Sequence, residues 1–291
     1  MTVAHRFSAF LGKLLLTQPQ KTDGTTKHRG IRTCLNAHYY GTKLSSANSL
    51  LIGSWGKSTQ IRPPRDIDIL FILPNSVYER YQLRPGNKQS QILQEVKTVV
   101  AYTYPNTSLR GDGQVVLVGF GSYAVEVLPA FLLTNNQFWI CDTHGGGTYK
   151  KADPYAEIAH VKISNDNTNE NTRHLIRMMK RWQDYCNVPI KSFLIELTGI
   201  EFLESWEYRD KSTVYYDWMI RDYLNFLKGK ANGYLWVPGT YEMLFLGNSW
   251  LSRADTAYAR ACKACKFESD DMPYSAGSEW QKIFGPDIPT G

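Results

Sequence analysis

The sequence predicts an α+β fold with an α/β first half and a helical second half. Short apolar strands, separated by Gly, Pro and polar loops, dominate up to about residue 150. Apolar residues at helical spacing dominate from about residue 167. We therefore expect two domains, an α/β core with an N-terminal helix over residues 1–165 and a helical domain over residues 166–291. At roughly 100–200 residues per domain, the 291 residues suffice for both.

The composition is that of a packed globular protein. Hydrophobic residues make up 43% of the chain and charged residues 21%, which excludes a disordered or fibrous class. The net charge of +6 suits a polyanionic ligand such as a nucleotide but does not require one. Five Cys without a framework spacing indicate reduced thiols and a cytoplasmic location. The apolar stretch at residues 115–133 contains Glu126 and Pro129, so we expect no membrane-spanning segment.

Each element of the first half follows from a local pattern. Residues 1–47 have a helical pattern with a basic, Thr-rich joint. A short apolar strand at residues 49–52 ends at Gly53-Ser54, and the alternating segment 66–73 runs into a second strand. Helical spacing predicts a helix over residues 89–102. The last two strands, residues 115–118 and 123–128, form a predicted hairpin around two glycines.

The second half is predicted to be a series of helices. They cover residues 171–186, 191–206, 213–228, 249–267 and 278–284. Aromatic residues crowd the third of these helices. Tyr216, Trp218, Tyr223 and Phe226 are interpreted as core and inter-helix packing, because aromatic side chains at this spacing mostly bury area.

Three acidic residues form the candidate chemical site. Asp66 and Asp68 lie two residues apart in an alternating segment, so their side chains share one face of the strand. Two carboxylates on one face raise each other's pKa unless a cation lies between them, which favours a divalent metal site. Glu126 lies among the apolar residues of a later strand, where a charge is costly unless it is paired or bound to a metal. The alternative is a strand with one solvated face.

The ordered motifs of the chain resemble a known enzyme family. Gly53-Ser54, followed by Asp66-Ile67-Asp68 and a third acid on a later strand, resembles the pattern of the DNA polymerase β-like nucleotidyltransferases. Further segments extend the resemblance over nearly the whole chain to the bacterial cGAS/DncV-like nucleotidyltransferases, or CD-NTases. These segments are Glu126–Phe131, Leu175–Trp182, Ile190–Phe193 with Glu196, and Glu279–Gly285.

The resemblance implies a fold and a reaction. The fold would be a polymerase β-like nucleotidyltransferase core, a mixed twisted sheet with flanking helices, plus a helical substrate-binding domain of the oligoadenylate synthase/poly(A) polymerase type. A hydroxyl of one nucleotide would attack the α-phosphorus of a nucleoside triphosphate, and a second turn would close a cyclic oligonucleotide. Asp66 and Asp68 would ligate two Mg²⁺ ions, for which Mn²⁺ can substitute, and Glu126 the one that holds the nucleophile. The family's third acid is frequently Asp, so Glu126 is one methylene longer.

The resemblance also assigns nucleotide contacts. Gly53 and Ser54 would bind the triphosphate tail, and Lys180 and Ser192 would hold the β- and γ-phosphates from the helical domain. Phe193 would stack on the donor base. From the residues alone, Lys180 could equally be an exposed helix Lys and Ser192 a helix N-cap.

The loop before the Asp pair offers two further candidates. Gln60 and Arg62 could contact phosphate or simply solvate the loop. Both are included among the predicted nucleotide-binding residues.

The implied function is a cyclic di- or trinucleotide synthase in bacterial antiphage (CBASS) signalling. Nucleoside triphosphates, ATP and GTP first, would be the substrates, and a separate effector would respond to the cyclic product. No DNA ligand and no membrane are implied, and we expect a monomer. Two alternatives stay open: a nucleotidyltransferase that adds nucleotides to an RNA or small-molecule acceptor, and a catalytically silent nucleotide-binding module.

Overall fold

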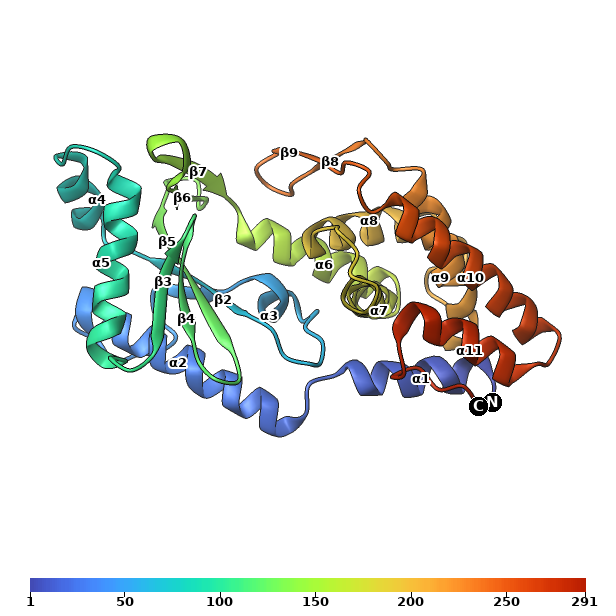
Figure 1. The fold of residues 1–291 in the computed structure, drawn as a ribbon. Coiled ribbons are helices and arrows are strands. Elements are labelled where there is room, and N and C mark those ends of the chain that lie inside the picture. Colours follow the sequence, from blue (N-terminus) through green and yellow to red (C-terminus); the bar gives the residue numbers. More distant parts are fainter. The chain divides into compact units, whose positions relative to one another are not determined.

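A computed structural model describes residues 1–291, the whole chain, and divides it into two compact units. The sheet unit comprises residues 17–60 and 64–158. The helical unit comprises residues 1–16, 61–63 and 159–291. Figure 1 shows the elements of both. The α+β class is therefore confirmed, whereas residues 1–16, predicted to belong to the α/β core, lie in the helical unit.

A seven-stranded mixed sheet forms the centre of the sheet unit (Figure 1). Five strands follow one another in the order β1 (Ser49–Leu51), β2 (Ile67–Ile72), β5 (Ala124–Leu132), β4 (Val115–Gly119) and β3 (Ser108–Asp112). The long strand β5 pairs with β4 through its first half and with β6 (Phe138–Asp142) through its second. β7 (Thr148–Ala152) pairs with β6. The β2–β5 pair is parallel and the other pairs are antiparallel.

Helices cover the sheet and lie between some of its strands along the chain. They are α2 (Gln18–Tyr40), α3 (Gly53–Lys57), α4 (Asn75–Gln82), α5 (Lys88–Thr103) and the 3₁₀ turn His144–Gly146. A capping box starts α2, because the Thr17 side chain accepts from the backbone N–H of Gln20 and the Gln20 side chain accepts from that of Thr17. Gly41, in the left-handed region, ends this helix.

The strands bury different residues on their two faces. Ile67, Ile69, Val125 and Val127 belong to the core under α2 and α5, to which those helices contribute Ile31, Leu35, Ile92 and Val96. Leu70 belongs to a second, smaller cluster with Ala130, Phe138 and Ile140. Because side chains alternate along a strand, Asp68 and Glu126 face the side of the smaller cluster. The acidic residues are thus on the face opposite α2 and α5.

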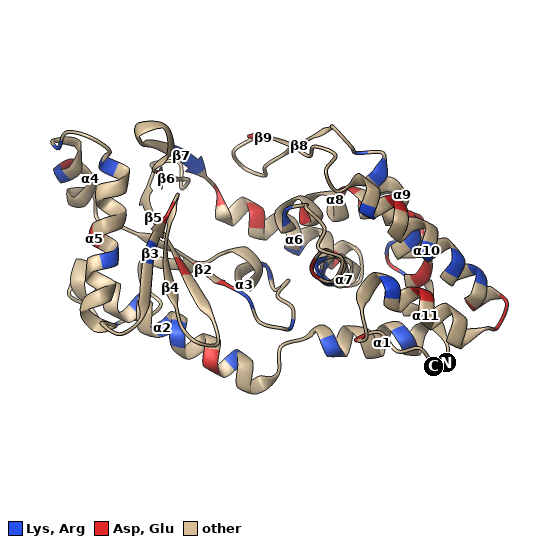
Figure 2. Ribbon diagram, in the orientation of Figure 1, with Lys and Arg blue, Asp and Glu red and all other residues tan.

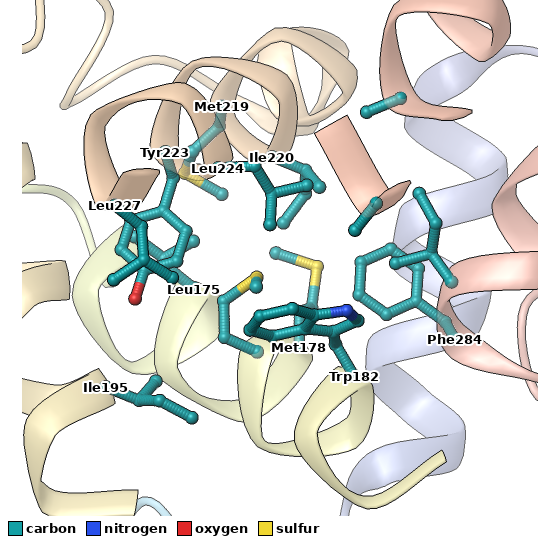
Figure 3. Close-up of a cluster of buried hydrophobic side chains, with 14 of the residues drawn as sticks. Leu175, Met178, Trp182, Ile195, Met219, Ile220, Tyr223, Leu224, Leu227 and Phe284 are labelled. Carbon is teal, nitrogen blue, oxygen red and sulfur yellow. The ribbon is translucent and has the colours of Figure 1, made fainter. Parts of the chain in front are cut away.

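The helical unit is a bundle with one small hairpin. Its elements are α1 (Val3–Leu14), the later part of α6 (Pro154–Asn167), α7 (Asn171–Tyr185), α8 (Ser192–Ser205), the 3₁₀ turn Thr213–Tyr215, α9 (Tyr216–Lys228), α10 (Leu251–Ser269), α11 (Pro273–Phe284), and the paired strands β8 (Tyr234–Trp236) and β9 (Met243–Phe245). Figure 3 shows its core, in which Leu175 and Met178 of α7 lie against Ile220 and Leu224 of α9. This core is separate from those of the sheet unit.

The N-terminal helix α1 packs on this bundle through aromatic side chains. The Phe7 ring lies 5.3 Å from the indole of Trp280, and the Phe10 ring lies 4.9 Å from the ring of Phe284. The helical pattern of this segment indicated no partner, and its partners in the structure include α7, α9 and α11. Residues 1–16 therefore belong with the C-terminal helices.

Arg6 of α1 adds a buried polar anchor. It has no exposed surface. Its Nε donates to Oε1 of Glu268 at 2.9 Å, and its guanidinium also donates to the carbonyls of Pro273 and Thr290, at 2.7 and 3.0 Å, and to that of Pro289. The charge is thereby satisfied inside the bundle, and the segment after α11 is held against α1.

The structure corrects parts of the predicted element list. Strands β3, β6, β7, β8 and β9 and helices α3, α4 and α6 were not predicted, and α3 begins where a loop was expected after Gly53-Ser54. Of the aromatics interpreted as core, Tyr216 and Tyr223 are buried, but Trp218 is 39% exposed and packs edge-on against Tyr208 and Tyr215 at the surface. No helix is both long and apolar enough to span a membrane.

Candidate active site

Asp68 and Glu126 lie next to each other on the parallel strand pair. Their Cα atoms are register partners between β2 and β5, and both residues are half-buried. Asp66 is exposed and lies one residue before β2, where Figure 2 shows acidic residues in red. By alternation it faces the same side as Asp68. The structure thus brings together Asp68 and Glu126, and Asp66 lies beside them at the start of the strand.

Gly53 fits closely against Asp68. The backbone N–H of Ile52 donates to the carbonyl of Asp68 at 3.0 Å, which holds the turn before α3 against β2. A Cβ on Gly53 would lie only 1.9 Å from Oδ2 of Asp68. Gly53 also has a φ of +53°, a conformation that L side chains rarely adopt. Ser54 follows it in the first turn of α3. Gly53 of the Gly-Ser motif is therefore in contact with Asp68, the second Asp of the Asp-Ile-Asp motif.

Burial and neighbouring negative charges raise the pKa of the Glu126 carboxyl. Burial, followed by the negative charges of Asp68, Asp66 and Asp112, raises the pKa of its carboxyl from 4.5 to about 7. Arg110 opposes this shift. It lies on β3 in the same transverse row of the sheet, because Glu126 pairs with Leu117 of β4 and Leu117 pairs with Arg110. The face therefore carries an excess of negative charge.

These carboxylates fit a divalent cation in charge and in ligand chemistry. Carboxylate oxygens are the ligands that Mg²⁺ prefers, and a cation would relieve the repulsion that raises the pKa of Glu126. No three His, Cys, Asp or Glu side chains are already arranged around one metal position. Binding a cation therefore requires the carboxylates to move toward one another, which their mutual repulsion otherwise opposes.

Lys180 is buried in the helical unit and is ion-paired. Only 6% of its side chain is exposed, and its Nζ donates to Oε1 of Glu196 on α8 at 2.7 Å. The alternative of an exposed helix Lys is wrong. Glu196 is part of a motif noted in the sequence, but its pairing with Lys180 was not predicted. The two residues lie on different helices, and no sequence spacing indicates which side chains of different helices meet.

Ser192 and Phe193 begin α8. Lys191 is the N-cap, so the alternative that Ser192 is the cap is wrong. The Ser192 hydroxyl donates to Oε1 of Gln183 at 2.8 Å, and the Gln183 amide donates to the carbonyl of Ile190. Phe193 is half-buried and packs against the core of the helical unit. Gln183 was missed by sequence reasoning and fixes the orientation of Ser192.

Gln60 and Arg62 belong to different units. Gln60 is in the sheet unit, where its side-chain oxygen is buried without a hydrogen-bond partner. Arg62 is in the helical unit, and its backbone N–H donates to the carbonyl of Leu14 at 2.8 Å. Their roles toward a nucleotide stay predictions.

Comparison with known proteins decides the family. Residues 1–165, more than half of the chain, match the family model of the Second Messenger Oligonucleotide or Dinucleotide Synthetase domain. The chain belongs to this family. It is a nucleotidyltransferase of the CD-NTase type, so the resemblance found in the motifs is confirmed.

Relatives of this synthetase cover most of the chain at low identity. It is 20% identical over 275 residues to a probable cyclic nucleotide synthase of Bacillus cereus. The alignment covers 82% of this chain and 81% of that protein. The structure of Escherichia coli MS115-1 CdnC with ATP matches at 15% identity with a TM-score of 0.72 and covers 98% of both chains.

A third relative is the cyclic AMP-GMP synthase DncV of Vibrio cholerae. Its complex with the linear intermediate 5′ pppA(3′,5′)pG matches at 13% identity with a TM-score of 0.76, over 98% of this chain and 96% of that one. The fold of CdnC and DncV is therefore the fold of this synthetase, which confirms the predicted nucleotidyltransferase fold class.

Proposed function

We propose that this synthetase makes a cyclic di- or trinucleotide from nucleoside triphosphates, with two Mg²⁺ ions, or Mn²⁺ in their place, at Asp66, Asp68 and Glu126. The observation that carries the proposal is the register pairing of Asp68 with Glu126 on adjacent parallel strands, with Asp66 at the start of the same face. Burial and the negative charges of Asp68 and Asp66 raise the pKa of Glu126, and a bound cation would relieve this repulsion.

Each acidic residue has its own part in the proposed reaction. When bound, the ions supply a lower pKa for the attacking hydroxyl and neutralise the charge on the leaving pyrophosphate. Asp66 and Asp68 hold both ions, and Glu126 holds the one nearest the attacking hydroxyl. Because the Glu126 carboxyl keeps its proton up to about pH 7 without a cation, it must release that proton to act as a ligand. The missing side chain of Gly53 leaves the space that the Asp68 carboxylate occupies.

The phosphate and base contacts follow the family pattern. Gly53 and Ser54 bind the triphosphate tail, and Lys180 and Ser192 hold its β- and γ-phosphates. Phe193 stacks on the donor base. The pairing of Lys180 with Glu196 and of Ser192 with Gln183 supports this part of the proposal, because it fixes both side chains in defined positions.

The product is proposed to act as a second messenger in antiphage signalling through a separate effector. The family description and the names of the relatives support the second-messenger part of this proposal: one relative is a probable cyclic nucleotide synthase, another is a cyclic AMP-GMP synthase seen with a linear pppApG intermediate, and a third was solved with ATP. ATP and GTP are accordingly the first substrates to test.

The experiment is a labelled-product assay. The purified protein is incubated with the four α-³²P-labelled nucleoside triphosphates and Mg²⁺ or Mn²⁺, treated with phosphatase, and analysed by thin-layer chromatography and mass spectrometry. We expect a phosphatase-resistant product whose mass gives ring size and base content. The variant Asp66→Asn/Asp68→Asn should form none. The control, Asp210→Asn, removes an exposed carboxylate of the helical unit and should retain activity.

The other outcomes separate the alternatives. Products that are entirely phosphatase-sensitive, or that require an added acceptor, would identify a linear or acceptor-dependent transferase. Nucleotide binding without any product under both metals would identify a silent binding module. Full activity of the double variant would refute the metal assignment.

A further inference from the structure

A basic pocket in the helical unit lies on elements that carry none of the acidic site. It has a volume of about 280 Å³ and lies between the C-terminal end of α7 and the helices α10 and α11. Its lining includes Trp182, Cys186, Asn187, Arg253, Arg260 and Lys282. Figure 2 shows Lys and Arg along α10 and α11 in blue.

The pocket has more positive than negative charge. Glu279 is the acid that holds two of the cations: its Oε1 accepts from Nζ of Lys282 at 2.5 Å, and its Oε2 lies 3.5 Å from Nη1 of Arg260. Arg253 is exposed and has no ion-pair partner. The single negative charge of Glu279 compensates only one of the two positive charges of Lys282 and Arg260. The pocket therefore keeps an excess of positive charge.

The excess of positive charge favours an anionic ligand. Trp182 contributes to the lining of the pocket but is fully buried, and its indole nitrogen has no accessible surface, so the donors that can face a ligand are the basic side chains. An anion supplies acceptor oxygens and the charge that the guanidinium and ammonium groups lack.

We propose that this pocket binds a small anion that carries a phosphate group. Arginine presents a planar fork of N–H donors that matches phosphate oxygens, and two arginines line the pocket. The volume exceeds what a bare phosphate fills, since one water occupies about 30 Å³. The anion is therefore either inorganic phosphate with water or the phosphate end of a small organic molecule. This inference does not depend on the proposed reaction.

Cys186 provides a reporter inside the pocket. Its thiol is half-buried, and burial raises its pKa while Arg253 and Arg260 oppose that shift. Peptide-resolved mass spectrometry would follow its alkylation by iodoacetamide in the full chain, in phosphate against chloride at equal ionic strength. We expect saturating phosphate to slow Cys186 alkylation at least fivefold and to leave Cys34, a half-buried thiol of α2, unchanged. Equal rates in phosphate and chloride would overturn the proposal.

Variants test whether the protection arises in this pocket. Arg253→Gln/Lys282→Gln removes two exposed cations of the pocket and should abolish the phosphate-dependent part of the protection. The control Lys263→Gln/Lys266→Gln removes the same charge from exposed positions of α10 and should keep it. Thermal unfolding checks that both variants fold. Protection that survives in the first variant as in the control would refute the site.

Two probes distinguish the sources of the phosphate group. Inorganic phosphate and adenosine monophosphate are titrated separately against Cys186 alkylation. Equal half-protecting concentrations would identify free phosphate as the ligand, and a lower value for the nucleotide would identify an organic phosphate. Either result upholds the site, whereas protection by neither would exclude it.

Discussion

The Gly53 backbone and the Asp68 carboxylate occupy space that no Cβ could share. We expect Gly53→Ala to lower the rate of product formation at least 100-fold, because the new methyl group would displace Oδ2 of Asp68, 1.9 Å away. The backbone alone costs about 1 kcal/mol, since φ is positive. Gly41→Ala is the matched control: its φ is +64°, and a Cβ there would meet nothing within 4 Å. Both variants should lose similar stability, and only Gly53→Ala should lose activity. Normal turnover by Gly53→Ala would show that this contact is dispensable.

Glu126 makes the stability of the metal-free protein depend on pH. Its folded pKa of about 7 lies above the ordinary 4.5, so the folded state holds a proton that the unfolded state releases between these values. The ionised group therefore costs stability above pH 7, and the cost disappears as the pH falls to 4.5. We expect Glu126→Gln to be more stable than the wild type by about 1–2 kcal/mol at pH 8 and equal to it near pH 4.5. Urea unfolding in EDTA at both pH values measures this. A pH-independent difference would contradict it.

Single residues differ in how far sequence could place them. The shared face of Asp66 and Asp68 follows from strand alternation, and the charge of Glu126 among apolar neighbours marked it as unusual. The burial of Lys180 did not follow from any pattern. It lies on α7, a helix enclosed on several sides, and a lysine there reads as solvent-exposed until its partner on α8 is known.

The α7–α8 helix pair is held by the buried Lys180–Glu196 ion pair. Removing one partner leaves the other charge buried, so Lys180→Met should cost about 3–5 kcal/mol of unfolding free energy. The double variant Lys180→Met/Glu196→Gln should recover part of this loss. Lys266→Met, which breaks the exposed pair with Asp270, should cost about 1 kcal/mol or less. Denaturant unfolding compares the four proteins, and a double variant no more stable than Lys180→Met would show that the buried charge is not the cause.

Among the elements, long periodic helices and apolar strands were predictable, and short polar ones were not. Helices α7, α8 and α9 follow their predicted ranges to within a few residues. Strand β7 has the sequence TYKKA, and β8 and β9 have three residues each. Such segments have too few apolar positions to show a period of two. They become strands because they pair with neighbouring strands.

At the scale of the molecule, each unit has a core of its own. Phe10→Ala should therefore destabilise the helical unit by about 3–5 kcal/mol, because it leaves a cavity beside Phe284. Hydrogen exchange should show faster exchange in α1, α7 and α11 and unchanged protection in β2 and β5. Ser8→Ala, an exposed change on the same helix, should leave both units unchanged. If β2 and β5 lost as much protection from exchange as the helices, the two cores would not unfold separately.

The order of the two domains followed from composition and periodicity, but the position of α1 did not. An amphipathic helix at the start of a chain packs on whichever apolar surface fits it, and sequence spacing does not say which. In this protein α1 packs on α7, α9 and α11, all of which lie more than 150 residues further along the chain.

This separation affects how the protein is made. The ribosome releases α1 first and its partners α7, α9 and α11 more than 150 residues later, and at roughly 5–20 residues per second the delay is on the order of ten seconds or more. During that time the phenylalanine and leucine side chains of α1 have no bundle to enter, and nascent chains with such exposed surfaces are the clients of chaperones. The sheet unit, residues 17–60 and 64–158, has cores of its own, so the sheet with its carboxylates can fold on the ribosome while the helical unit is still being synthesised.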